Sequence, residues 1–142
     1  MKIVINVCFG GFSLSNKAIK RYLELKGEEC YFYKQTKWNY SDGYEEYTLT
    51  DENDNTSSFI YCYTKNLGDK ITKLDDMENY WFNDRKIDRT DKELIKVIEE
   101  LGCEANGCCA KLKVVEIPDD VNWEIDDYDG IESIEEVHRS WY

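Results

Sequence analysis

The sequence has no long hydrophobic run, only one proline and one histidine, and few basic residues for its many acidic ones. No stretch of 18 consecutive apolar residues is present, which argues against a transmembrane helix. The first apolar run, residues 2–8, is one strand long and leads into Gly10-Gly11, so no signal peptide is expected. These absences predict a cytoplasmic protein whose six cysteines are reduced thiols.

The scarcity of basic residues also argues against general binding to DNA or RNA. Thirty acidic residues against eighteen basic ones give a net charge of −12, which repels polyanions. The charge is uneven along the chain. Residues 1–40 carry seven Lys or Arg and three Glu, whereas residues 116–142 carry ten acidic residues and one Arg. The basic N-terminal region is therefore compatible with a small phosphate ligand.

The order of the periodic segments predicts an α/β or α+β fold with a mixed β-sheet, formed by one globular domain spanning residues 1–142. A buried strand over residues 2–8 precedes a helix over residues 16–26, for which Ser15 is the expected N-cap. A strand over residues 30–33 follows after a short connection. This succession predicts an N-terminal β-α-β unit with parallel strands.

The rest of the chain predicts a β-hairpin, further strands and two more helices. Residues 46–50 and 59–63 flank a polar turn and form the predicted hairpin. The second helix follows a capping box at residues 90–93 and ends at Gly102, and the third covers residues 131–139. Strands are expected at 111–117 and 122–126, and residues 80–82 are either a short strand or an aromatic plug.

The connection between the first strand and the first helix is the main functional signal. Gly10 and Gly11 lead into a helix start, where free backbone N–H groups favour an anion such as phosphate. Ser13, Ser15 and Asn16 add donors at the same place. The segment lacks both the full dinucleotide fingerprint and the Lys-Ser/Thr of a P-loop, and a purely structural tight turn is the alternative.

Arginines and aromatic residues complete the predicted ligand site. Arg85 and Arg89 lie just before the second helix and suit bidentate phosphate contacts, the alternative being ion pairs with neighbouring aspartates. Phe9 and Phe12 either stack a base or attach the turn to the core. The predicted ligand-binding residues are Phe9, Gly10, Gly11, Phe12, Ser13, Asn16, Arg85, Arg89, Tyr128 and Arg139.

No metal site, cofactor or catalytic residue is predicted. Asp127, Asp129, Gly130 and Glu136 match four positions of an EF-hand loop, but Ile125 occupies the first position and cannot ligate calcium. The spacing of Cys103, Cys108 and Cys109 does not match a zinc site. A nucleophilic pair such as Cys8 with His138 has no local signature to support it.

Two blocks of sequence resemble a known family. They are residues 2–15 (KIVINVCFGGFSLS) and a C-terminal block that contains EELGCEANG, KLKVVEIPDD, WEIDDYDG and HRSW, between residues 99 and 141. They resemble a family of small, mostly uncharacterised proteins encoded by bacteriophages and prophages. The resemblance covers about half of the chain and implies a phage accessory protein located in the host cytoplasm.

Small phage accessory proteins include counter-defence sponges, which sequester nucleotide messengers of bacterial immunity without cleaving them. The resemblance and the predicted site together suggest a sponge for a cyclic or ADP-ribose-type nucleotide, enclosed across a homo-oligomer interface. The second hypothesis is an acidic inhibitor that docks onto a host defence protein. A third is a metal-dependent nucleotide-processing enzyme that uses Asp126, Asp127 and Asp129.

Overall fold

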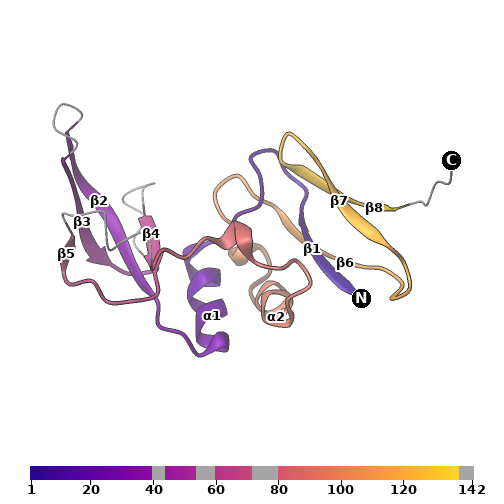
Figure 1. Ribbon diagram of the computed structural model, residues 1–142, viewed down its shortest axis with the longest axis horizontal. Coiled ribbons are helices and arrows are strands. Elements are labelled where there is room, and N and C mark those ends of the chain that lie inside the picture. The colour runs from indigo at the N-terminus through magenta and orange to yellow at the C-terminus, as the bar shows by residue number, and fades with distance from the viewer. Residues whose placement is uncertain (40–43, 54–59, 72–79, 138–142) are drawn as a thin grey trace, which may run out of the picture. The chain divides into compact units, whose positions relative to one another are not determined.

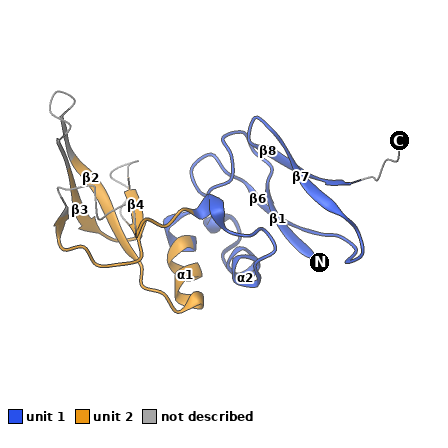
Figure 2. Ribbon diagram, in the orientation of Figure 1, with its two compact units in different colours: residues 1–18, 84–142 blue, residues 19–83 orange. Residues whose placement is uncertain are grey.

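The computed structural model describes residues 1–39, 44–53, 60–71 and 80–137. Its contacts divide the chain into two compact units, residues 1–18 with 84–142 and residues 19–83 (Figure 2). The boundary falls inside helix α1, Asn16–Lys26. The predicted combination of helices and strands is confirmed, and the single domain expected from the chain length stays a prediction.

The first unit, residues 1–18 with 84–142, contains two antiparallel strand pairs and a helix (Figure 1). Strand β1, Lys2–Asn6, pairs with β6, Leu112–Glu116. Strand β7, Trp123–Tyr128, pairs with β8, Ile131–Glu136. Helix α2, Lys92–Leu101, packs against β1 and β6. The helix buries Leu94, Val97 and Ile98, whose spacing puts them on one face.

The second unit, residues 19–83, is built on a four-stranded antiparallel sheet in the order β4-β2-β3-β5. Its strands are β2 (Tyr31–Asn39), β3 (Tyr44–Thr50), β4 (Ile60–Tyr63) and β5 (Lys70–Ile71). The core of this sheet is made of tyrosines: Tyr33, Tyr47 and Tyr63. In this unit, aromatic residues, which are frequent in the sequence, therefore fill the core.

Helix α1 confirms the first predicted helix, with the same limits. Ser15 is its N-cap, because the backbone N–H of Ala18 donates to the Ser15 hydroxyl at 3.2 Å. The apolar face that the sequence predicts is buried, with Ala18, Tyr22 and Leu23 each less than 10% exposed. A short polar run after Gly27, which has a positive φ of 73°, leads to β2.

The predicted β-α-β unit is wrong. β1 and β2 belong to different sheets, and every strand pair in the described residues is antiparallel, so the predicted mixed sheet is also corrected. The predicted order of strand, helix and strand is observed, but this order does not specify which strands pair. β1 instead pairs with a strand more than a hundred residues away in the sequence.

The predicted hairpin between residues 46–50 and 59–63 is also wrong as a pairing. Both segments are strands, β3 and β4, but β2 lies between them and pairs with each. Strand β2 is nine residues long, far longer than the predicted four, and so offers hydrogen-bonding groups along both edges. Of the predicted polar turn, residues 51–53 follow β3 and the rest lies outside the described residues.

The predicted third helix at residues 131–139 is contradicted by strand β8. Asp129 and Gly130 form a two-residue loop between β7 and β8, with positive φ values of 54° and 89°. An Asp-Gly pair with both residues at positive φ is the preferred type I′ connection of a hairpin. The turn therefore outweighs the helix-like spacing of Ile134, Val137 and Trp141.

Helix α2 is confirmed, but its N-cap lies one residue later than the predicted capping box. Asp91 caps the helix by accepting the Glu93 N–H at 2.9 Å. The Thr90 hydroxyl is engaged elsewhere, donating to Asp88 Oδ1 at 2.6 Å. The same carboxylate accepts the Thr90 N–H, and these hydrogen bonds lower the pKa of Asp88. The helix ends at Gly102, as predicted.

Candidate functional site

The glycine loop, residues 9–13, is held between two other loops of the first unit. A Cβ added to Gly10 would lie 2.8 Å from the Cys109 Cβ. A Cβ added to Gly130, in the β7–β8 turn, would lie 2.4 Å from the Gly11 nitrogen. Gly10 and Gly11 themselves have positive φ values of 111° and 90°. The loop therefore has structural reasons for its glycines, namely close packing at Gly10 and a positive φ at both positions.

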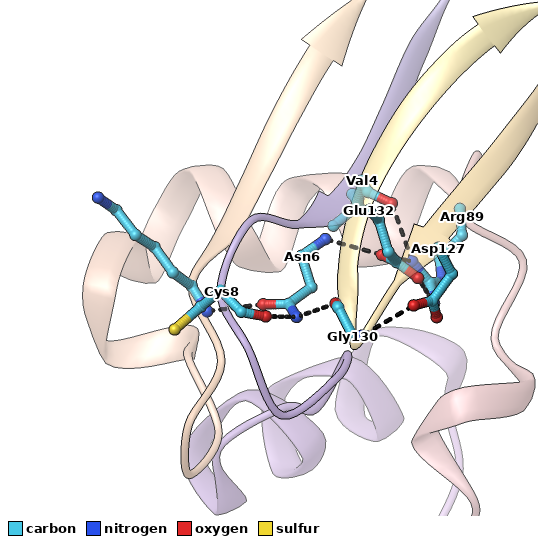
Figure 3. A network of polar contacts seen from close by, with 8 residues as sticks. Val4, Asn6, Cys8, Arg89, Asp127, Gly130 and Glu132 are labelled. Atoms are coloured by element: carbon cyan, nitrogen blue, oxygen red, sulfur yellow. Dashed lines mark hydrogen bonds and ion pairs between the residues drawn. The ribbon is translucent and has the colours of Figure 1, made fainter.

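A buried asparagine holds these loops together. Asn6, at the end of β1, is 0% exposed, and its backbone N–H donates to Glu132 Oε1 at 2.8 Å. Its Nδ2 donates to the carbonyls of Cys8 and Gly130, each at 2.7 Å, and its Oδ1 accepts the Lys111 N–H at 2.8 Å (Figure 3). One amide thus positions the β7–β8 turn beside the glycine loop.

Arg89 forms a nearly buried ion pair with Glu132. Its two terminal nitrogens lie 2.6 and 2.9 Å from the two carboxylate oxygens, and the side chains are 16% and 6% exposed. Nη1 also donates to the Val4 carbonyl at 3.3 Å, while the Val4 N–H donates to the Arg89 carbonyl (Figure 3). The guanidinium covers the Phe12 ring, 3.8 Å from its centroid. Together these contacts close the edge of β1 that faces away from β6.

An open cavity of about 410 Å³ lies beside this network. Residues 10–12 form one wall, and Arg85 and Arg89 approach from the segment before α2. The hairpin supplies the rest: Asp127, Asp129, Gly130 and Glu132. All of these residues belong to the first unit. The volume lies within the range of small-molecule sites in proteins.

Five of the ten predicted ligand-binding residues line this cavity: Gly10, Gly11, Phe12, Arg85 and Arg89. Phe9 and Tyr128 adjoin lining residues in the sequence and are 60% and 77% exposed. Ser13 and Asn16 are not among the lining residues, and the Ser13 hydroxyl faces the Cys108 carbonyl at 3.4 Å. Arg139 lies outside the described residues, as does His138.

The segment just before α1 already binds a carboxylate of the protein. The Leu14 N–H donates to Asp84 Oδ2 at 2.8 Å, and the Ser15 hydroxyl caps the first turn. In the described part of the chain, no acceptor is found for the backbone N–H groups of Gly10, Gly11 and Phe12. These three donors lie in the glycine loop, several residues before the helix.

Asn6 and Glu132 are the important residues that the sequence prediction missed. A polar residue at the end of the apolar run of β1 was a signal for Asn6, because a buried amide must be hydrogen-bonded. Glu132 gave no such signal, since acidic residues crowd the whole C-terminal segment. Arg89 pairs with Glu132 and not with the nearby aspartates considered as alternatives.

The acidic and thiol side chains that were candidates for metal binding or catalysis make mainly local structural contacts. Asp127 Oδ1 accepts the Gly130 N–H at 2.8 Å and closes the hairpin turn. Cys108 and Cys109 are exposed, with sulfurs 3.5 Å apart, and this contact raises the pKa of Cys109. Across the described ranges, no three His, Cys, Asp or Glu side chains are grouped to hold a metal ion.

Comparison with known protein families, curated proteins and solved structures found no match. Among the described residues, no helix combines the length and the apolar character needed to span a membrane.

Proposed function

We propose that the cavity binds a small nucleotide and that the protein sequesters this ligand without cleaving it. In this proposal the glycine-loop N–H groups and Arg85 hold phosphate, and the exposed rings of Phe9 and Tyr128 stack on the base. The proposed setting is that of a phage accessory protein that counters immune signalling in the host cytoplasm. A second copy of the chain would complete the enclosure of the ligand.

The observation that carries the proposal is the convergence of three distant segments on one cavity. The glycine loop, the arginines before α2 and the β7–β8 turn all line it. The two loops that meet at Gly11 and Gly130 also carry large exposed aromatic side chains, Phe9 and Tyr128. Aromatic rings can stack on a base, and free backbone N–H groups can bind phosphate.

The charges of the cavity restrict the ligand. Glu132 neutralises Arg89, and Arg85 lines the same cavity as Asp127 and Asp129. Two carboxylates oppose a chain of several phosphates but accept hydrogen bonds from ribose hydroxyls or base amino groups. We therefore expect a ligand with few phosphates and several sugar hydroxyls, as in an ADP-ribose-type or cyclic nucleotide.

The direct test is a thermal-shift screen of purified protein against such nucleotides. A ligand at about 100 times its dissociation constant should add about 2.7 kcal/mol to the free energy of unfolding. The bound ligand is then released by heat and identified by mass spectrometry. Intact ligand supports sequestration, altered ligand indicates the enzyme that would use Asp126, Asp127 and Asp129, and no shift across the screen contradicts the proposal.

Arg85 offers a variant with a close control. Arg85 and Lys86 are adjacent and exposed in a short 3-10 helix, Asp84–Lys86, but only Arg85 lines the cavity. Arg85→Ala should weaken nucleotide binding at least about tenfold, since it removes a charge-assisted contact to phosphate. Lys86→Ala removes the same charge and should change affinity little. Equal effects of the two variants in calorimetry would reduce Arg85 to a general electrostatic role.

The second candidate function is docking of the acidic hairpin onto a basic host protein. β7 and β8 place Glu124 directly opposite Glu135, with Asp126 beside them on the same face, and all three are exposed. Like charges at paired positions oppose each other in the free protein. Residues 117–137 contain no Lys or Arg to offset them. A host protein captured at low salt and released at high salt would support this function.

A further inference from the structure

Two cysteines of the second unit lie in contact at one end of the β2–β4 ladder. The sulfurs of Cys30 and Cys62 are 3.3 Å apart. Phe32 in β2 is paired with Cys62 in β4, and Cys30 lies two residues before Phe32. Because side chains alternate along an extended chain, Cys30 and Cys62 share one face of the sheet. Their contact follows from the strand register and joins residues 32 positions apart.

The two thiols differ in access. Cys62 is 4% exposed, whereas Cys30, at the strand entrance, is partly exposed. The hydrogen bond with Cys62 lowers the pKa of Cys30, and the positive charge of Lys20 lowers it further. A thiolate is the reactive form of cysteine. Cys30 is therefore suited to attack from outside, with Cys62 in position to react next.

We propose that Cys30 and Cys62 form a reversible disulfide by exchange with low-molecular-weight disulfides such as oxidised glutathione. The Cys30 thiolate attacks one sulfur of that disulfide, forms a mixed disulfide and releases one thiolate. Cys62 then loses its proton and attacks the Cys30 sulfur, which releases the second thiolate. Two protein thiols are oxidised by two electrons, and one small disulfide is reduced to two thiols.

The bond joins β4 covalently to the residue before β2 and closes the intervening chain into a loop. Such a link removes conformational freedom from the unfolded chain, so the oxidised protein should melt at a higher temperature than the reduced protein. The site lies in the unit comprising residues 19–83, whereas the residues lining the cavity belong to the other unit. The proposal therefore holds or fails independently of nucleotide binding.

The experiment equilibrates the folded wild-type protein in glutathione buffers of graded redox potential and maps its disulfides by mass spectrometry after acid quenching. The expected result is a Cys30–Cys62 linkage that reverts in reducing buffer. The exposed Cys108 and Cys109 serve as an internal comparison, and the double variant Cys108→Ser with Cys109→Ser should keep the Cys30–Cys62 linkage unchanged.

Single variants test the order of the steps. Cys62→Ala should accumulate glutathione on Cys30, because the second thiol is absent, while Cys30→Ala should leave the buried Cys62 free. The proposal is overturned if the wild-type protein keeps both thiols free while Cys108 and Cys109 oxidise. It is equally overturned if the wild-type protein retains glutathione on Cys30 without forming the linkage.

Discussion

The two units of the chain fill their small cores with different kinds of side chain. The first unit buries an ion pair and an amide among aliphatic side chains, centred on Arg89, Glu132 and Asn6. The second unit buries tyrosines, with the Tyr33 and Tyr63 rings edge to face at 5.5 Å. Its buried polar groups include the Tyr33 hydroxyl, which donates to the Gly68 carbonyl at 2.8 Å, and the Glu46 carboxylate, which lies 3.5 Å from the Lys70 Nζ.

The difference matters for function because the polar core of the first unit positions loops. Asn6 and Arg89 bond to backbone groups of β1, of the β7–β8 turn and of Lys111, which precedes β6. The cavity lies beside this network. The tyrosines of the second unit chiefly make packing contacts between strands. A buried ion pair is sensitive to loss of one partner, whereas a ring that loses one hydroxyl keeps most of its contacts.

The largest effect is expected for Glu132→Gln. This change leaves the Arg89 charge buried without its partner and should lower the free energy of unfolding by about 3–5 kcal/mol. Hydrogen exchange should rise in β1 and β8 and stay unchanged in β2. The exposed Lys2–Glu99 pair, 2.7 Å apart, is the control, and Glu99→Gln should have little effect. Equal losses for the two variants would remove the contrast between buried and exposed pairs.

Gly130→Ala should come next. Gly130 and Gly11 have nearly equal φ values, 89° and 90°, but only a Cβ on Gly130 would meet backbone within 4 Å. Gly11→Ala therefore measures the backbone strain alone, of about 1–2 kcal/mol. Gly130→Ala adds the clash with the glycine loop and should cost about 2–4 kcal/mol in urea unfolding. Equal losses of unfolding free energy in the two variants would contradict the close packing of the hairpin turn against the glycine loop.

Tyr33→Phe should have the smallest effect, about 1 kcal/mol, because the ring remains and only the hydroxyl contacts are lost. Those contacts are the bond to Gly68 and one accepted from the Leu67 N–H at 3.0 Å. Tyr61→Phe, which keeps its ring contact with Tyr47, serves as the control in the same urea experiment. A loss as large as that of Glu132→Gln would show that hydroxyl contacts, and not ring packing, dominate the second unit.

Alkaline titration tests the Tyr33 hydroxyl again, and the direction of its effect on stability follows from the direction of the pKa shift. Burial raises the pKa of Tyr33 above its ordinary value of 10.0, so the folded state holds this proton more tightly than the unfolded state. The resulting stability is complete below pH 10 and is lost as the pH rises through the higher folded pKa. Tyr33→Phe should remove this part of the pH dependence. An unchanged alkaline profile in the variant would assign the titration to other groups.

Local signals predicted local structure well and pairing poorly. Helix α1 was predicted to the residue, because Ser15, the apolar face and Gly27 are all local features. The third helix failed because residues 131–139 were judged by spacing, while the Asp129-Gly130 turn before them specifies a hairpin. Two local signals, the helical spacing and the Asp-Gly turn, pointed to different structures, and the turn was the correct one.

The candidate site was predicted in part for the same reason. The glycine loop, Arg85 and Arg89 were identified from residue type and position, and they do line one cavity. The pairing of Arg89 with Glu132 joins positions 43 residues apart, and the Asn6 contact with Gly130 joins positions 124 apart. No local pattern encodes such contacts, since they depend on which strands meet.

The sequence by itself determined the two helices, the position of most strands and the acidic character of the C-terminal segment. Periodicity, caps and charge are properties of neighbouring residues, and they act before the chain is folded. Only the tertiary structure decided that β1 pairs with β6, that β2 lies between β3 and β4, and that Asn6 holds the β7–β8 turn beside the glycine loop. These arrangements depend on burial, because an amide or an ion pair is placed where the whole fold satisfies its hydrogen bonds.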